Sequence, residues 1–343
     1  MDVRELAAQV RLGRPRAVAR LISLVENAAE NIAEYSTGNA AGNAARAGGE
    51  GGAEPPGANR VLREVMADLA TGAARPYTAR VIGLTGAPGV GKSTSTGMLI
   101  RAFRRRGSRV GVLAVDPSSP FTGGALLGDR VRMQEHATDP EVFIRSMSSR
   151  GHLGGLAWAT PQALRVLEAA GCDVILVETV GVGQAEVDVA RLADTTVVIL
   201  APGMGDGVQA AKAGILEVAD VLVVNKADRD GVQATVRELR NMTGLAEPPW
   251  RPPIVTTVAS REEGVDDLTA ALDKHQAYLD ESGEGRRRRL ARARDEIEAI
   301  ALARLRSRFA GLHGDRLDAL ATRLLDAGTD PYTAADDLLA ALR

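Results

Sequence analysis

The distribution of apolar and polar positions divides the chain into three parts. Residues 2 to about 34 place apolar side chains at roughly helical spacing between arginines and glutamates, which predicts one helix. Residues 36–58 are rich in Gly, Ala, Asn and Pro and hold hardly any large apolar residue, so we expect a flexible linker there. A second helix is expected over about 59–71, and the pattern is helical again from about residue 265 onward.

Short apolar runs alternate with helical segments between residues 80 and 264. These runs are apolar on both faces, which is typical of parallel strands covered by helices on both sides. We therefore expect an α/β domain over 80–264, with an N-terminal helical extension over 1–79 and a C-terminal helical region over 265–343. The expected strands are Val81–Thr85, Val110–Val115, Val142–Ile144, Val174–Val177, Thr196–Leu200, Val221–Val224 and Ile254–Thr256.

A glycine-rich segment follows the first expected strand and precedes a helical stretch. This order of strand, loop and helix is that of a P-loop, in which glycines let backbone N–H groups approach phosphate and the helix N-terminus adds positive charge. The fold class expected is therefore a P-loop NTPase, in which Lys92 binds the β- and γ-phosphates and the Ser93 hydroxyl binds Mg²⁺. The nucleotide-binding residues expected here are Gly86, Ala87, Pro88, Gly89, Val90, Gly91, Lys92, Ser93 and Thr94.

The tetrapeptide Asn225-Lys226-Ala227-Asp228 follows the sixth expected strand. Downstream of a P-loop, this pattern indicates guanine recognition, because the Asp228 carboxylate accepts from the purine N1–H and 2-amino groups, and adenine lacks that amino group. Val258 and Ala259, after the last strand, occupy the place of a backbone contact to guanine O6. The bound nucleotide expected is therefore GTP or GDP.

Three acidic residues follow two of the expected strands. Glu178 ends a buried strand, three residues before Gly181, which suits a carboxylate that holds Mg²⁺ through water and a glycine N–H that contacts the γ-phosphate. Asp116 ends another strand, and Asp129 lies in the loop that follows it. Both aspartates are placed to bind Mg²⁺ or to activate water, and the sequence leaves open which does which.

Composition and charge exclude several classes of function. The chain has 343 residues, a net charge of -2 and 3% aromatic residues, so neither a basic field nor a base-stacking surface favours nucleic acid. We expect no membrane association, since no stretch reaches the apolar length of a span and the N-terminus lacks the shape of a signal peptide. The single Cys172 fits a core position in a cytoplasmic protein. We interpret the basic run Arg286–Arg289 as a solvated helix start rather than a nucleic-acid patch.

Together these residues resemble the MeaB/ArgK/MMAA group of P-loop GTPases over about residues 59–343. Beyond the nucleotide motifs, the resemblance rests on Asp116-Pro117-Ser118-Ser119, Leu127-Gly128-Asp129-Arg130, Arg150–Leu156, Glu178–Gln184, Pro202–Asp206 with Gln209 and Lys212, and Asp330–Ala335. Such proteins act as chaperones of adenosylcobalamin-dependent acyl-CoA mutases. The resemblance implies a Mg²⁺-dependent GTPase that gates cobalamin loading and protects or reactivates a mutase, with methylmalonyl-CoA mutase as the first candidate.

The resemblance also implies roles for individual residues. Ser93, Asp116, Asp129 and Glu178 would surround Mg²⁺ and the attacking water. The segment 203–212 would be a mobile switch that the mutase orders. In it, Lys212 is either a catalytic cation brought to the phosphate by the partner or a solvated helix residue, and both readings stay open.

Members of this group are usually homodimers through their C-terminal helices. The chain has a continuous apolar stripe in that region, which either forms such an interface or packs on its own nucleotide-binding domain. Its members are Leu290, Ala293, Ile297, Ala301, Leu305 and Phe309.

Three other functions compete with a mutase chaperone. A nucleotide-dependent binding module without hydrolysis is disfavoured by the intact set Lys92, Ser93 and Glu178. A kinase or ATPase of an amino-acid transport system would use ATP, which the guanine motif disfavours. A nickel-insertion GTPase would need a His-rich or Cys/His segment, and the chain has four His and one Cys.

Overall fold

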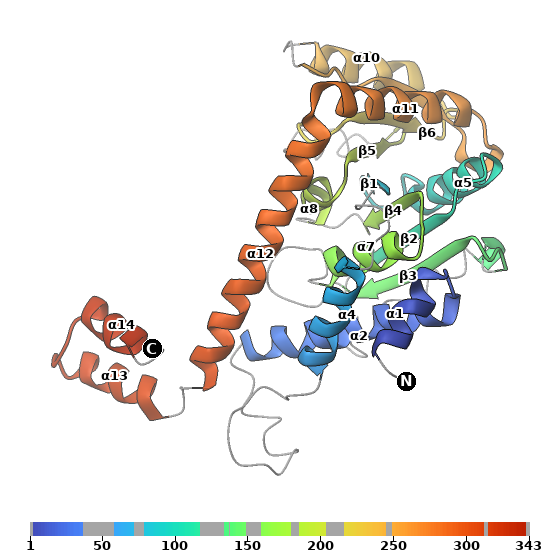
Figure 1. The fold of residues 1–343 in the computed structure, drawn as a ribbon. Coiled ribbons are helices and arrows are strands. Elements are labelled where there is room, and N and C mark those ends of the chain that lie inside the picture. The colour runs from blue at the N-terminus through green and yellow to red at the C-terminus, as the bar shows by residue number, and fades with distance from the viewer. Residues whose placement is uncertain are drawn as a thin grey trace.

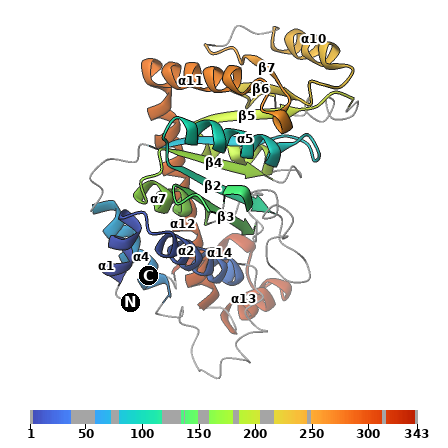
Figure 2. The ribbon, with the colours of Figure 1, turned by 90° about the vertical axis from the view of Figure 1, so that its right-hand side faces the viewer.

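A computed structural model describes residues 3–36, 58–71, 79–116, 134–136, 138–148, 159–179, 185–203, 216–244, 249–311 and 315–340. A parallel sheet of seven strands lies at its centre, in the order β3-β2-β4-β1-β5-β6-β7 (Figure 1). The strands are β1 (Arg80–Thr85), β2 (Val110–Asp116), β3 (Val142–Ser148), β4 (Val174–Thr179), β5 (Thr195–Leu200), β6 (Val221–Asn225) and β7 (Ile254–Thr257). Figure 2 shows them stacked from β7 at the top to β3 at the bottom.

The predicted α/β fold with a parallel sheet is confirmed, and each expected strand is present. Several strands extend beyond their apolar run. Their last residues are polar and lie at the edge of the sheet where the loops begin. Asp116, Thr179 and Asn225 end β2, β4 and β6 in this way. Polar residues from three strands therefore lie at the carboxyl edge of the sheet.

Helices cover both faces of the sheet. On one face, α5 (Lys92–Arg105) and α11 (Val265–Ser282) share a core with alternate residues of the strands, such as Ile82, Leu176 and Val197. On the other face, α7 (Thr160–Ala169) and α8 (Ala185–Leu192) pack on Val81 and Ile175, and α10 (Val232–Thr243) packs on β5 and β6. The domain boundaries expected from the sequence stay a prediction, although α11 shares the core of the sheet.

The N-terminal region forms α1 (Val3–Arg11), α2 (Pro15–Ser36) and α4 (Ala58–Thr71), which pack beside α7 near the β3 end of the sheet. The expectation of one helix over residues 2–34 is wrong. Gly13 has φ +66, and a Cβ at that position would lie 2.9 Å from Arg109 Nη1. Pro15 then begins α2, and a proline disfavours helical backbone at the residue before it. The linker expected over 36–58 lies almost entirely outside the described residues.

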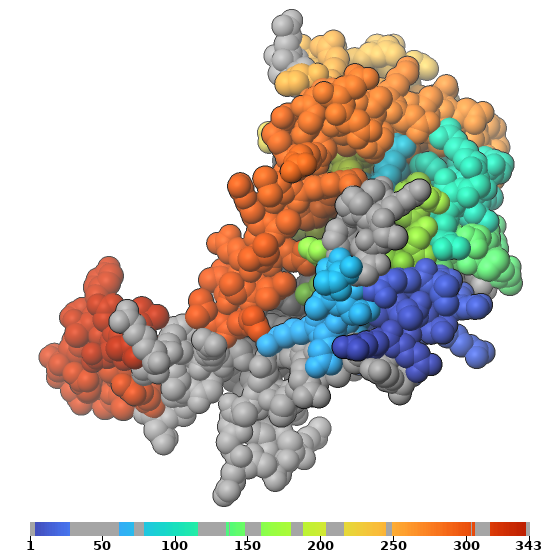
Figure 3. All heavy atoms as spheres, in the orientation of Figure 1, coloured from blue at the N-terminus to red at the C-terminus, as the bar shows by residue number. Residues whose placement is uncertain are grey.

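The C-terminal region begins with the long helix α12 (Glu284–Gly311), which runs from α11 past α8 to α2 (Figure 1). α13 (Asp315–Leu325) and α14 (Pro331–Ala340) contact each other and stand apart from the sheet (Figure 3). Among the helices that the structure describes, none is both long enough and apolar enough to cross a membrane.

The basic run at the start of α12 does not behave as a solvated helix start throughout. Arg286 and Arg287 are exposed, as expected. The Arg288 guanidinium donates to both carboxylate oxygens of Asp220, at 2.8 and 2.9 Å, and Arg289 Nη2 donates to Asp194 at 2.9 Å. The sequence interpretation is therefore wrong for Arg288 and Arg289.

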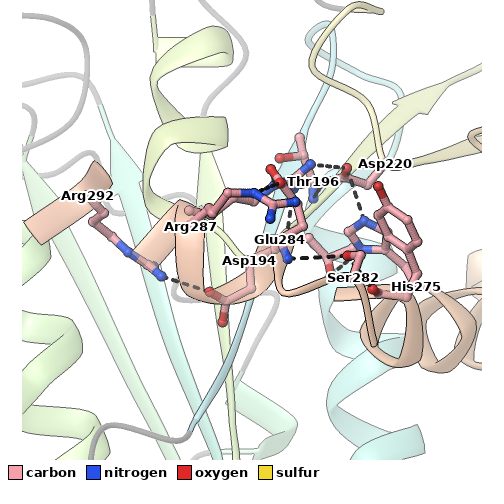
Figure 4. Close-up of polar contacts among 11 residues, drawn as sticks. Asp194, Thr196, Asp220, His275, Ser282, Glu284, Arg287 and Arg292 are labelled. Atoms are coloured by element: carbon pink, nitrogen blue, oxygen red, sulfur yellow. Dashed lines mark hydrogen bonds and ion pairs between the residues drawn. The ribbon is translucent and has the colours of Figure 1, made fainter. Parts of the chain in front are cut away.

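The two aspartates explain this difference. Asp194 and Asp220 stand directly before β5 and β6 and are only 1% and 4% exposed, so each buried charge needs partners. Asp194 also accepts from Arg292 at 2.7 Å, and Asp220 accepts from the Thr196 backbone N–H at 2.8 Å (Figure 4). The N-terminal half of α12 is thereby attached to the amino edge of the sheet, opposite the edge that carries the nucleotide motifs.

Replacement of these arginines should separate buried from solvated members of the run. Arg288→Ala should lower the free energy of unfolding by about 2–4 kcal/mol, because Asp220 stays buried without its bidentate partner. Arg287, whose exposed pair with Glu284 is 2.8 Å long, is the matched control, and Arg287→Ala should cost less than about 0.5 kcal/mol. Urea unfolding at pH 7 measures both, and equal losses would contradict the assignment.

The cost of Arg288→Ala should also depend on pH. Burial alone would raise the pKa of Asp220, but hydrogen bonds from His275 and Arg288 outweigh it, so the pKa lies below its usual value. The ionised pair therefore stabilises the fold at neutral pH, and this contribution is lost as the pH falls through the pKa of the folded state. The difference in stability between the variant and the parent chain should shrink in acid.

Candidate functional site

The P-loop is shaped by glycines at points of close backbone approach. Gly86 has φ +141, and a Cβ there would lie 2.1 Å from the Ile199 carbonyl oxygen of β5. Gly91 has φ +99 and directly precedes α5, and a Cβ there would lie 2.4 Å from Asn225 Nδ2. A larger side chain at either position would push the loop away from the sheet, so these glycines hold the loop at the start of α5.

Lys92 lies inside this loop. The residue is only 7% exposed, and its ammonium group donates to the carbonyl oxygens of Gly86 and Ala87 at 2.7 and 3.1 Å. The cation is therefore held at the N-terminus of α5, where helix backbone N–H groups and the helix dipole already favour an anion. This arrangement suits the predicted phosphate-binding role of Lys92.

Glu178 reaches the same helix from β4. Its Oε1 accepts from the Ser93 hydroxyl at 2.6 Å and its Oε2 accepts from the Thr96 hydroxyl at 2.8 Å, and the residue is 3% exposed. Glu178 is therefore a buried carboxylate and not a surface acid at the end of a strand. Sequence reasoning missed Thr96, although its position one helical turn after Lys92 places it on the same side of α5 as the P-loop.

Asn225 connects the P-loop with the segment after β7. Its Nδ2 donates to the Val90 carbonyl oxygen at 2.8 Å, and its Oδ1 accepts from the Thr257 hydroxyl at 3.1 Å and from the Ala259 backbone N–H at 3.0 Å. The residue is 2% exposed. One side-chain amide therefore fixes the distance between the expected phosphate site and the expected guanine site.

The remaining residues of the guanine motif lie in the turn after β6. Lys226 has φ +59, and its ammonium group donates to the Gly89 carbonyl oxygen at 2.5 Å. Asp228 is exposed at the other end of the turn, with Oδ2 3.2 Å from Arg261 Nη2. The Ala259 N–H donates to Asn225, so the contact of Val258 and Ala259 with guanine O6 stays a prediction.

The other predicted site residues are only partly described. Asp116 ends β2, where Val115 is paired with Thr179, so its backbone lies beside the end of β4. Asp129, Gly181 and Lys212 lie outside the described residues.

A metal would meet oxygen ligands at the end of β4. In the part of the chain that the structure describes, no three His, Cys, Asp or Glu residues converge on one point. The Ser93 hydroxyl and a Glu178 carboxylate oxygen are 2.6 Å apart, and hard oxygen donors of this kind suit Mg²⁺. The described residues therefore fit a magnesium ion that takes its remaining ligands from phosphate and water.

Comparison with known proteins agrees with these motifs. The family model described as methylmalonyl Co-A mutase-associated GTPase MeaB matches residues 52–313. A candidate GTPase of Pyrococcus abyssi is 43% identical over 343 residues, covering 98% of this chain and 95% of the relative. GTPase ArgK of Escherichia coli is 41% identical over 217 residues, covering 61% and 65%. The mitochondrial methylmalonic aciduria type A homolog of Mus musculus is 39% identical over 216 residues, covering 61% and 52%.

One solved structure supports the fold. It is described as LAO/AO transport system kinase, and it has a TM-score of 0.67 and 23% sequence identity, covering 98% of this chain and 96% of that one. The family resemblance, the P-loop fold and GTP hydrolysis, all expected from the motifs, are confirmed by these matches.

The contact between Thr96 and Glu178 can be tested with an isosteric replacement. Thr96→Val removes the hydroxyl that donates to Glu178, a charge-assisted bond worth about 1.5–3 kcal/mol, so basal GTP turnover should fall about tenfold and require more Mg²⁺. GDP affinity without Mg²⁺ should stay within about twofold. Turnover at several Mg²⁺ concentrations is the measurement.

Ser95 supplies the matched control. It is fully buried on the same helix, and among the described residues its hydroxyl has no hydrogen-bond partner. Ser95→Ala should therefore leave turnover within about twofold. Equal losses in the two variants would mean that the effect of Thr96→Val comes from packing of α5.

Proposed function

The chain belongs to the MeaB family of GTPases, and on this basis we propose that it is the nucleotide switch of a chaperone for an adenosylcobalamin-dependent acyl-CoA mutase. The observation that carries the proposal is the match of residues 52–313 to a family described as methylmalonyl Co-A mutase-associated. The likeness to the mouse methylmalonic aciduria type A homolog points in the same direction. Methylmalonyl-CoA mutase is the proposed partner, and gating of cobalamin loading with protection or reactivation of the mutase is the proposed role.

The proposed hydrolysis begins with the phosphates held by the P-loop backbone and Lys92. Ser93 and Glu178 would hold Mg²⁺ together with Asp116 and Asp129, and one of the two aspartates would orient the attacking water. The bound ion would supply positive charge that offsets the negative charge developing on the phosphoryl oxygens. Water attacks the γ-phosphorus, the bond to the β–γ bridging oxygen breaks, and GDP, phosphate and a proton are released. The Gly181 N–H contacts the γ-phosphate.

The proposed base recognition uses the two turns that Asn225 connects. Asp228 accepts from guanine N1–H and the 2-amino group, and the segment Val258–Ala259 contacts O6. Because adenine would leave the Asp228 carboxylate without a donor, ATP is disfavoured. This preference supports a GTP switch over a transport kinase that uses ATP.

Communication with the mutase is proposed to run through the segment 203–212. The segment carries little apolar surface. Ordering it without a partner would therefore cost conformational entropy that the burial of apolar area does not offset. A mutase that orders the segment would bring the Lys212 ammonium toward the charge developing on the transferred phosphoryl group, as arginine fingers do.

Purified mutase tests the partner and the role of Lys212 in one experiment. GTP turnover of the parent chain should rise on addition of apo methylmalonyl-CoA mutase. Lys212→Ala should leave GTP affinity and basal turnover within about threefold, an effect under about 0.7 kcal/mol, and lower the stimulated rate about tenfold. Absence of stimulation would contradict the proposal that this mutase is the partner. Equal stimulation of both chains would mean that Lys212 is a solvated helix residue.

We also propose a homodimer through α12. Three members of its apolar stripe, Leu290, Ile297 and Leu305, are 51%, 68% and 43% exposed within one chain. Exposed apolar side chains at helical spacing favour an intermolecular contact over packing on the chain's own domain. The Phe309 side chain lies outside the described residues.

A charge placed in the stripe tests this interface. Ile297→Arg should shift the chain from dimer to monomer at micromolar concentration, because burying an unpaired charge in an apolar contact costs several kcal/mol. Glu298→Arg, on the next exposed position of the same helix, should stay dimeric. Light scattering distinguishes the two, and a monomeric parent chain would contradict the dimer.

A further inference from the structure

The carboxylate expected to read guanine has an arginine partner that no motif indicated. Arg261 Nη2 lies 3.2 Å from Asp228 Oδ2, and Arg261 Nη1 lies 3.7 Å from Glu263 Oε1. The side chains of Arg261 and Asp228 are 59% and 37% exposed. Asp228 lies in the turn after β6 and Arg261 in the turn after β7. The ion pair therefore joins the two segments that border the expected base site.

The backbone that carries Arg261 is held in place. Arg261 is the last residue of the 3-10 helix η2 (Ala259–Arg261), and its N–H donates to the Val258 carbonyl oxygen at 2.8 Å. The next residue, Glu262, binds Arg101 and Arg105 of α5 through its carboxylate. The start of η2 is bound to Asn225 through the Ala259 N–H. The guanidinium is therefore directed at Asp228 from a turn fixed to β6 on one side and to α5 on the other.

We propose that Arg261 is a positioning residue for base selection, which orients the Asp228 carboxylate toward the guanine N1–H and 2-amino groups. An ionised carboxylate has about four acceptor sites on its two oxygens. The contact with Arg261 uses one site on Oδ2, so Oδ1 and the remaining site on Oδ2 are left for the base. The proposal rests on the assignment of Asp228 to the guanine edge, which is tested separately below.

The energetics favour orientation over stability. An exposed ion pair contributes at most about 1 kcal/mol to folding, so Arg261 has little effect on the stability of the domain. Recognition of a base edge with two donors depends more strongly on the orientation of Asp228 than folding does, because both N–H groups must meet carboxylate oxygens in one plane. Loss of Arg261 lets the exposed Asp228 side chain rotate, and the contact with the 2-amino group suffers most. Inosine nucleotides lack that group and serve as the probe.

The experiment compares GDP and IDP affinities by calorimetry for the full chain and its variants. Arg261→Ala should weaken GDP binding about fivefold and IDP binding less than about twofold, so the preference for GDP falls about threefold. Arg261→Lys, which keeps the charge but not the planar fork, should lie between. Basal kcat should stay within about twofold, since the phosphate site is untouched, while KM for GTP rises.

Two further variants make each outcome decisive. Glu263→Gln, which removes the other carboxylate near Arg261, should leave both affinities within about twofold. In an Asp228→Ala background, Arg261→Ala should cause no further loss, because its effect acts through Asp228. An unchanged GDP preference in Arg261→Ala, tighter GDP binding, or additive losses in the double variant would overturn the proposal. If Asp228→Ala itself leaves the GDP preference unchanged, the assignment of Asp228 is the part that fails.

Discussion

The buried amide of Asn225 is the contact on which the geometry of the nucleotide site depends. It donates to Val90 in the P-loop and accepts from Ala259 after β7, and the residue is 2% exposed. A buried amide is stable only when its donor and acceptor groups are paired, so the two loops must keep the spacing that satisfies it. The absence of a Cβ at Gly91 permits this approach. The spacing between the proposed phosphate site and the proposed base site is therefore set by one side chain.

The opposite edge of the sheet is held by charge. Asp194 and Asp220 are buried before β5 and β6, and arginines of α12 approach them, so the long helix is attached at the edge away from the loops. Buried ion pairs of this kind add little net stability compared with apolar packing, but a placement of α12 that left Asp194 or Asp220 without its arginine partner would be costly.

Much of the site was predictable because its motifs are local. The order of strand, glycine-rich loop and helix places Lys92 and Ser93, and a tetrapeptide after a buried strand places Asn225 and Asp228. Thr96 and Arg261 were not predictable. Thr96 matters through a contact with Glu178, 82 residues away, and Arg261 through a contact with Asp228 from another turn. The two contacts leave no spacing signal along the chain, although the position of Thr96 one helical turn after Lys92 does place it on the side of α5 that carries the P-loop.

The sequence by itself determined the parallel sheet, the P-loop and the guanine motif, because apolar runs on both strand faces and closely spaced polar residues act over a few positions. It also predicted α12 as a helix. Only the tertiary structure decided which arginines of Arg286–Arg289 are solvated, because adjacent residues on a helix point about 100° apart and only one side of α12 faces the buried aspartates. Contacts with residues that are distant in sequence decide whether such an arginine is solvated or paired, and the sequence alone does not show which residues those are.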